Sequence, residues 1–138
     1  MSDDLAKRET VNKAHVLIVD DEREFATTLS ERLRLRGYEA HAAFTAEEAL
    51  KAVGASAPDV VLLDLNLPGV RGVELLMTLR QQLPHGEIIL LSGHLDLADK
   101  IEGVRIDAFG LLLKPVEMSE LTEKIDAAQA KRGMHAPR

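Results

Sequence analysis

The sequence predicts a single α/β domain in which a five-stranded parallel sheet is doubly wound, with five helices on its two faces. Three observations support this class. Five short apolar runs recur along the 138 residues, segments with helical spacing separate them, and the connections are short. Strands that alternate with helices are typical of a parallel sheet, because each crossover returns the chain to the same end of the sheet. The runs are continuous rather than alternating, which indicates strands buried on both faces.

The first predicted strand spans residues 15–19, and the polar residues 1–14 before it are predicted to form a flexible lead-in. Residues 23–36 are predicted to form the first helix, because apolar side chains recur at every fourth position and make one stripe. These apolar positions are Phe25, Leu29 and Leu33. Gly37 follows at the place where a left-handed helix C-cap favours glycine.

The second strand is predicted over residues 38–44, and its weak pattern suggests a place near an edge of the sheet. Thr45 and Glu48 match a capping box, in which a hydroxyl and a carboxylate three residues later cap a helix N-terminus. The helix that follows is predicted to end near Gly54. Residues 59–64 form the third predicted strand, an apolar run that ends in a carboxylate.

The third helix is predicted over residues 73–83, where a proline stops it, and the fourth strand over residues 87–91. The fourth predicted helix, residues 96–106, has a thin apolar face. It also contains Gly103, which costs a helix about 1 kcal/mol relative to Ala. We therefore expect this helix to be held loosely.

The chain is predicted to end with a fifth strand over residues 109–113, a last helix over residues 119–132 and a disordered tail, residues 133–138. The sequence contains no internal repeat and no linker-like stretch. One domain over residues 15–132 is therefore expected.

The composition excludes several classes of function. The absence of cysteine excludes disulfides and thiolate metal sites and fits a reducing compartment, so we expect a cytoplasmic protein. The formal net charge of −6 argues against nucleic acid as a direct partner of this chain. No apolar run approaches the roughly 20 residues that cross a bilayer, so no membrane partner is expected.

Polar residues follow the predicted strands at the points where the strands end. Asp20 and Asp21 follow the first strand, Asp64 ends the third, Ser92 follows the fourth and Lys114 follows the fifth. Because functional groups collect at the carboxyl ends of the strands in an open parallel sheet, we expect these side chains to share one site.

Three carboxylates in one site repel one another, by about 4 kcal/mol per pair at 4 Å and an effective dielectric near 20. A bound cation or a raised pKa must relieve this repulsion. Oxygen ligands without His or Cys suit Mg²⁺. A metal ion, the Lys114 ammonium, the Ser92 hydroxyl and a nucleophilic carboxylate at Asp64 together describe a phosphoryl-transfer site.

Four short motifs at these strand ends resemble the response-regulator receiver domains of two-component phosphorelays, and the resemblance covers roughly residues 15–131. The motifs are Val19-Asp20-Asp21-Glu22, Asp64-Leu65-Asn66-Leu67-Pro68-Gly69, Ser92-Gly93 and Lys114-Pro115. Each motif is weak alone, but all four in this order are a strong signal. The resemblance implies a flavodoxin-like sheet with strand order 2-1-3-4-5.

The resemblance also implies a role for each site residue. Asp64 resembles the phospho-acceptor of the family. Asp21 resembles the direct Mg²⁺ ligand, Asp20 a ligand acting largely through water, and Asp64 and the backbone carbonyl of Asn66 complete the metal set. Lys114 resembles the lysine that pairs with the phosphate, and we expect it to pair with Asp64 at rest.

Other positions in the family set the lifetime of the phosphorylated state or respond to it. Ser92 resembles the switch hydroxyl, and the side chains of Asn66 and His94 resemble positions that tune hydrolysis. The family's aromatic switch position is occupied here by Leu111, which is a departure. Phe109 is expected on the same strand face as Leu111, where it could compensate. The Lys114–Pro115 bond resembles one that is cis in the family.

The expected function is therefore Mg²⁺-dependent transfer of a phosphoryl group to Asp64 from a phosphohistidine, followed by self-dephosphorylation, without turnover of any other substrate. The implied partner is a sensor histidine kinase or a histidine phosphotransfer domain. An output domain or downstream partner would use the face of the fourth helix, fifth strand and fifth helix. A homodimer formed on phosphorylation is a further expected partner.

Simpler interpretations stay open for each residue. Asp64 could only cap its loop, Asp20 and Asp21 could cap the first helix, Ser92 could be a turn residue and Lys114 a solvated side chain. Two other functions use the same parts. An aspartyl-phosphate phosphatase usually has a second acid where this chain has Asn66, and a scaffold receiver that needs no phosphorylation would fit Leu111.

Overall fold

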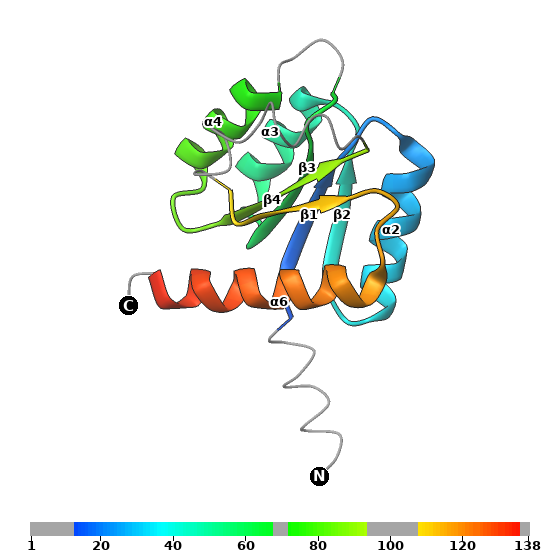
Figure 1. Cartoon of the computed structure of the whole chain (residues 1–138). Helices are drawn as coiled ribbons and strands as arrows, with labels where there is room; N and C mark the ends of the chain where they lie inside the picture. The colour runs from blue at the N-terminus through cyan, green and yellow to red at the C-terminus, as the bar shows by residue number, and fades with distance from the viewer. Residues whose placement is uncertain (1–12, 68–71, 94–107, 136–138) are drawn as a thin grey trace.

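The computed structural model describes residues 13–67, 72–93 and 108–135. Its described part contains one five-stranded parallel sheet with the order β2-β1-β3-β4-β5 (Figure 1). The strands are β1 (His15–Val19), β2 (Glu39–Ala43), β3 (Val60–Asp64), β4 (Glu87–Ser92) and β5 (Gly110–Leu113). The predicted fold class and the 2-1-3-4-5 order are confirmed.

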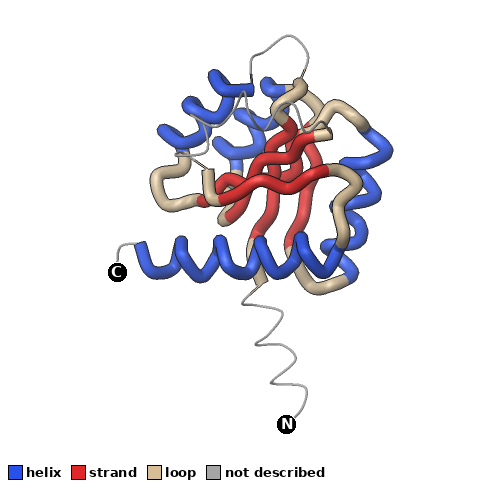
Figure 2. Tube along the Cα trace, viewed as in Figure 1, coloured by secondary structure: helices blue, strands red, loops and turns tan. Residues whose placement is uncertain are grey.

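Four helices lie within the described residues and cover both faces of the sheet (Figure 2). They are α2 (Arg23–Leu35), α3 (Ala46–Ala55), α4 (Gly72–Gln82) and α6 (Met118–His135). The helix predicted over residues 96–106 falls outside the described residues. No helix in the described ranges is long and apolar enough to cross a membrane.

The last helix differs from its predicted bounds. It continues to His135, so three residues that the sequence places in the tail are helical. A glycine at position 133 costs a helix only about 1 kcal/mol, which is not enough to end one that is already formed.

The sheet separates two aliphatic core layers. One layer joins α2 and α6 to the sheet, and the other joins α3 and α4 to it. All five residues of β3 are buried, because this strand has neighbours on both edges and helices on both faces. Burying a Leu or Val side chain contributes about 1.5–3 kcal/mol each, so the centre of the sheet is the main source of stability.

Two predicted helix caps are present. Gly37 has φ 95°, and the backbone N–H groups of Gly37 and Tyr38 donate to carbonyls in the last turn of α2, which is the pattern of a Schellman cap. At the start of α3, the Thr45 hydroxyl accepts a hydrogen bond from the Glu48 N–H at 3.1 Å. The Glu48 carboxylate reaches back to the N–H of Phe44 rather than to that of Thr45.

The entry into β5 departs from regular alternation. Phe109 packs against the α2–α6 layer, whereas Leu111 packs against the α3–α4 layer. The prediction that they share a face is wrong because β5 begins only at Gly110, so residue 109 precedes the regular strand. Phe109 therefore cannot substitute for an aromatic side chain at position 111.

Candidate functional site

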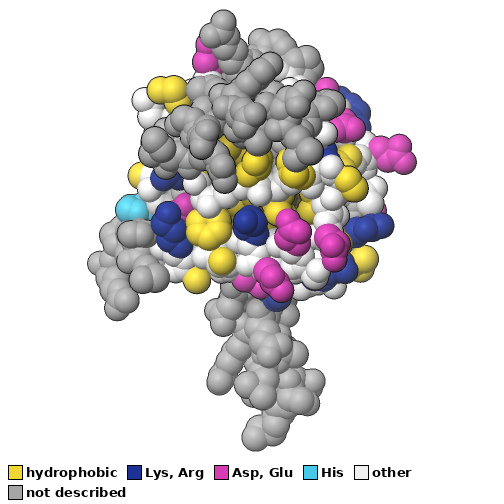
Figure 3. Space-filling model, viewed as in Figure 1, with side chains coloured by type: hydrophobic (Ala, Val, Ile, Leu, Met, Phe, Trp, Pro, Cys, Tyr) yellow, Lys and Arg dark blue, Asp and Glu magenta, His cyan; other side chains and the backbone are white. Residues whose placement is uncertain are grey.

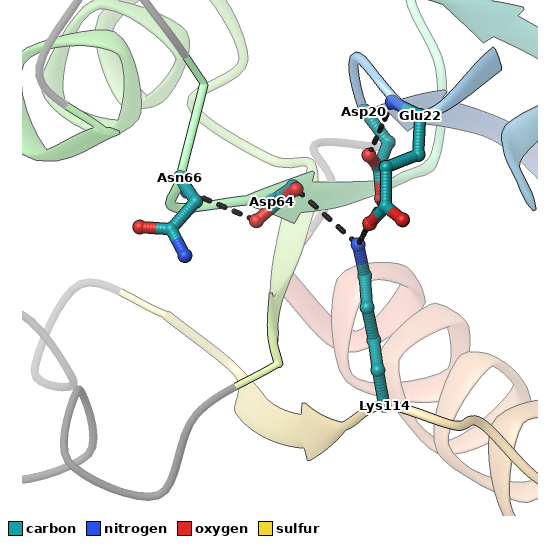
Figure 4. Close-up of polar contacts among 5 residues, drawn as sticks. All are labelled: Asp20, Glu22, Asp64, Asn66 and Lys114. Carbon is teal, nitrogen blue, oxygen red and sulfur yellow. Dashed lines mark hydrogen bonds and ion pairs between the residues drawn. The ribbon is translucent and has the colours of Figure 1, made fainter.

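The register of the sheet brings the predicted site residues to one edge. Asp64 pairs with Leu91 and Ser92 pairs with Leu113, so the carboxyl ends of β3, β4 and β5 lie side by side. Asp20 follows β1 directly, and its N–H donates to the Ala43 carbonyl at 3.0 Å. Figure 4 shows Asp20 and Asp64 converging on the ammonium of Lys114, as the strand ends predict.

The two carboxylate oxygens of Asp64 have different partners. Oδ1 accepts a hydrogen bond from the backbone N–H of Asn66 at 2.9 Å, and Oδ2 lies 3.3 Å from Lys114 Nζ. Figure 4 shows these two partners on opposite sides of the carboxylate. Asp64 therefore caps its loop and also faces the site, so its capping role does not exclude a functional one.

Lys114 is the centre of the charge network. Its ammonium lies 2.6 Å from Asp20 Oδ2, 2.6 Å from Glu22 Oε1 and 3.3 Å from Asp64 Oδ2. The side chain is largely buried, with its Nζ 4.5 Å from the centre of the Phe25 ring. Lys114 does pair with Asp64, as expected, but its nearer partners are Asp20 and Glu22.

These contacts keep the lysine charged. Burial alone would lower the pKa of Lys114, but the hydrogen bonds to Asp20 and Glu22 and the charge of Asp64 raise it above its ordinary value. The interpretation of Lys114 as a solvated surface side chain is therefore wrong, because strand β5 carries it into a cluster of acids.

Asp20 is fully buried, and its environment disfavours the charged form. Burial raises the pKa of Asp20 from 3.8 to about 6, against the opposing effects of Lys114 and of the Glu22 N–H, while the charge of Asp64 adds to the increase. Asp20 Oδ1 accepts that N–H at 2.9 Å. Glu22 occupies the N-cap position of α2 and makes no side-chain cap, so neither Asp20 nor Asp21 is the N-cap residue.

The acidic cluster has the donors that a hard cation needs. Carboxylate oxygens of Asp20, Asp21 and Asp64 all lie within 4.8 Å of one another, with Asp21 exposed and the other two buried. Asp20 Oδ2 is buried, and its partner is the Lys114 ammonium at 2.6 Å. A set of donors made only of carboxylate oxygens fits Mg²⁺.

The remaining predicted residues are placed as follows. Ser92 is fully buried at the end of β4, and its carbonyl accepts the Lys114 N–H at 2.8 Å. The Lys114–Pro115 bond is cis, as the resemblance implies. The Asn66 residue is exposed, and Leu111 is half-buried in β5. His94 lies outside the described residues.

Two contacts of the site were missed by the sequence analysis. Glu22 binds Lys114 as closely as Asp20 does, and Phe25 contacts the ammonium through its ring. The run of three acids ending at Glu22 was a usable signal for the first contact. Phe25 was assigned only to the apolar stripe of its helix, and nothing in the sequence distinguished its second contact.

A hollow of about 610 Å³ opens beside the acidic cluster, between α2 and the segment that follows β5. Glu22, Phe25 and Arg32 line one side of it, and Pro115 and Met118 line the other. It has both charged and apolar walls, and Glu22 belongs both to this hollow and to the charge network of Lys114.

Comparison with known proteins gives a family match over most of the chain. The profile described as the response regulator receiver domain matches residues 16–126. The chain is 36% identical over 123 residues to YkoG, an uncharacterized transcriptional regulatory protein of Bacillus subtilis, covering 89% of this chain and 54% of that protein. This chain thus spans about half the length of the curated relatives that it matches.

Solved structures resemble the described fold. A response regulator receiver domain protein of Clostridium thermocellum has a TM-score of 0.80 at 29% identity, covering 89% of this chain and 99% of that one. The response regulator protein TrrA of Thermotoga maritima, solved in complex with Mg(2+)-BeF, has a TM-score of 0.73 at 32% identity. That comparison covers 83% of this chain and 97% of the TrrA chain.

Proposed function

The chain belongs to the response regulator receiver domain family, and we propose on that basis that Asp64 accepts a phosphoryl group from a phosphohistidine on a partner protein. The partner is a sensor histidine kinase or a histidine phosphotransfer domain. The single observation that carries the choice of Asp64 is its position: it is buried at the end of β3, with Oδ2 facing the Lys114 ammonium.

The transfer makes one bond and breaks one. A carboxylate oxygen of Asp64 attacks the phosphorus, and the bond from phosphorus to the imidazole nitrogen breaks, leaving its electron pair on the imidazole. The Asn66 N–H holds the other oxygen and fixes the carboxylate, as the 2.9 Å hydrogen bond supports. Lys114, which is charged, stabilises the negative charge on the transferring group.

Asp20, Asp21 and Asp64 would hold Mg²⁺ in this proposal, together with the carbonyl of Asn66. The cluster of three carboxylates supports this assignment. Mg²⁺ supplies positive charge beside the phosphoryl oxygens when it is bound. The exposed Asp21 would bind the ion directly and Asp20 largely through water, as the resemblance to the family implies.

The phosphoryl group leaves by hydrolysis within the same site. Water attacks the phosphorus, the bond to Asp64 breaks, and inorganic phosphate and the free carboxylate remain. The side chains of Asn66 and His94 tune the rate of this hydrolysis, as the resemblance implies. The domain is therefore not an enzyme acting on other substrates, since the two reactions form and remove its own aspartyl-phosphate.

Phosphorylation changes a surface of the domain, and a partner recognises that change. Ser92 donates its hydroxyl to a phosphoryl oxygen and Lys114 moves from Asp20 toward the phosphate, which biases the face that includes β5 and α6. On the face that carries α6, acidic and basic side chains lie among hydrophobic ones (Figure 3). A partner, an output domain or a second phosphorylated copy binds that face in the cytoplasm.

Phosphorylation can be tested directly. The protein is incubated with Mg²⁺ and acetyl phosphate, and the phosphoryl adduct is measured by intact-mass spectrometry. The wild type should gain one phosphoryl group, and Asp64→Asn should gain none. Asp126→Asn, which changes an acid far from the cluster, is the matched control. An adduct on Asp64→Asn, or none on the wild type, would overturn the proposal.

Leu111 favours a second candidate, a scaffold receiver whose surface does not respond to phosphorylation. A beryllofluoride titration followed by two-dimensional NMR separates the two. Shifted signals in β5 and α6 support switching without an aromatic at position 111. Shifts confined to the strand ends, or no shifts at all, support the scaffold.

A further inference from the structure

Two histidines and a glutamate form a cluster at the end of the sheet opposite Asp64. His15 and Glu39 are the first residues of β1 and β2 and are register partners, while His41 lies two residues further along β2. Residues two apart on a strand point to the same face, so the pairing brings all three side chains together. This cluster is separate from the acidic site, and the proposed phosphoryl transfer does not use it.

Two distances within the cluster are close to those between ligands of a bound metal ion. Glu39 Oε2 lies 3.7 Å from His15 Nε2 and 3.5 Å from His41 Nε2. All three ligand atoms lie within 4.8 Å of one another. Two ligands bound about 2.1 Å from a tetrahedral zinc ion are roughly 3.4 Å apart. Small rotations of the two exposed side chains, Glu39 and His41, would therefore complete the geometry.

The backbone holds the least exposed ligand in place. The His15 N–H donates to Asp59 Oδ2 at 2.8 Å, and the Asp59 N–H donates to the His15 carbonyl at 2.8 Å. Both ring systems of the cluster are also in contact, with the His15 and His41 centroids 5.5 Å apart in an edge-to-face arrangement. The backbone that carries His15 is therefore fixed, and the other two ligands are exposed and can reach the ion from solvent.

A hollow beside the two histidines leaves room for a further ligand. Its volume is about 190 Å³, and its walls include both imidazole rings and the end of α3. The α3 side is lined by the small residues Ala52, Ala55 and Ser56. A metal ion held by three protein ligands would thus have its fourth position open to water from this hollow.

We propose that His15, Glu39 and His41 bind a divalent transition-metal ion, with Zn²⁺ as the best match. Imidazole nitrogens with one carboxylate suit Zn²⁺, whereas the oxygen-only cluster around Asp64 suits Mg²⁺, so the two sites select different ions. The zinc ion would join the edge strand β2 to β1 at the end of the sheet remote from the phosphoryl-transfer site.

Isothermal titration calorimetry with zinc chloride tests the site in the full chain. Saturating Mg²⁺ is present to occupy the acidic cluster. The wild type should bind one Zn²⁺ per chain, and His41→Ala and Glu39→Gln should each weaken it about tenfold or more, since even an outer-shell partner contributes that much to a metal site. Both changed residues are exposed, so the variants should remain folded.

Two control variants make the result decisive. His85→Ala removes an exposed histidine outside the cluster and should leave the zinc affinity unchanged. Asp64→Asn should also bind zinc as the wild type does. Two-dimensional NMR should show zinc-dependent shifts in the rings of His15 and His41. No binding, affinity that His41→Ala leaves unchanged, or affinity lost in Asp64→Asn would each overturn the proposal.

Discussion

The Lys114 ammonium lies closer to Asp20 Oδ2, at 2.6 Å, than to Asp64 Oδ2, at 3.3 Å. The lysine thus pairs more closely with the most deeply buried acid of the cluster than with the proposed nucleophile. A cation that binds Asp20 must compete with this ion pair. The strength of Mg²⁺ binding and the position of Lys114 should therefore be linked.

The first prediction concerns this competition. Lys114→Met should bind Mg²⁺ about fivefold more tightly, because removal of a positive charge from the cluster is worth about 1 kcal/mol or more. It should nevertheless form less phosphoprotein from acetyl phosphate, since the cation that stabilises the transferring group is lost. NMR titration with Mg²⁺ gives the affinity. Lys131→Met is the control on a half-exposed lysine elsewhere, and weaker Mg²⁺ binding by Lys114→Met would contradict the link.

The second prediction concerns stability and pH. Asp20 has its pKa raised to about 6 in the folded protein, so the folded state binds this proton more tightly than the unfolded state. The stability that it contributes is complete below about pH 4 and is lost as pH rises through 6. In Mg²⁺-free buffer, Asp20→Asn should therefore be more stable than the wild type at pH 7.5, by on the order of 2 kcal/mol.

Urea denaturation at pH 4.5 and pH 7.5 measures this difference. The gain from Asp20→Asn should be much smaller at the lower pH. Glu31→Gln makes the same acid-to-amide change on the exposed surface of α2 and should give no such pH-dependent gain. A gain of equal size at both pH values would show that burial of the Asp20 charge is not the cause.

The third prediction uses Tyr38, the only tyrosine of the chain. Its hydroxyl donates to Asp126 Oδ1 at 2.7 Å, and burial together with this bond raises its pKa. Ultraviolet titration should show that the folded protein ionises at higher pH than the urea-unfolded chain. Because the folded pKa is the higher one, stability should fall as pH rises above 10. Asp126→Asn should ionise at lower pH than the wild type, since it removes a negative charge beside the phenol.

The fourth prediction compares two leucines. Leu62 is fully buried in the central strand β3, whereas Leu35 is 85% exposed at the end of α2. Leu62→Ala should lower the free energy of unfolding by about 2–5 kcal/mol, because it removes buried methyl groups and leaves a cavity. Leu35→Ala should change it by less than about 0.5 kcal/mol. Urea denaturation of both variants checks the comparison, and similar losses would contradict the described core.

Much of the fold could be predicted because its signals are local. The apolar run from His15 to Val19 has the predicted bounds, since turn residues and acids limit it in the sequence. The positive φ of Gly37 follows from the need for a residue without a Cβ at a left-handed cap. The position of Asp64 at the end of β3 followed from the apolar run that ends in this carboxylate.

Other features depend on geometry that no local pattern contains. The choice of Lys114 between Asp20, Glu22 and Asp64 depends on side-chain torsions and on the path of the chain between Val19 and α2. The face taken by Phe109 depends on where β5 begins, which is one residue later than the apolar run suggests. The His15–Glu39–His41 cluster depends on the register between β1 and β2, which brings together residues that are far apart in the sequence.

The place of β2 at an edge of the described sheet has a consequence for self-association. An edge strand leaves backbone groups available for pairing with another chain, which favours aggregation. Glu39 and His41 stand exposed on this strand, and polar or charged side chains there oppose the addition of a further strand. At the other edge, β5 has only four residues. Both edges of the described sheet therefore oppose pairing with another chain. At β2 the polar side chains oppose it, and at β5 the short length of the strand does.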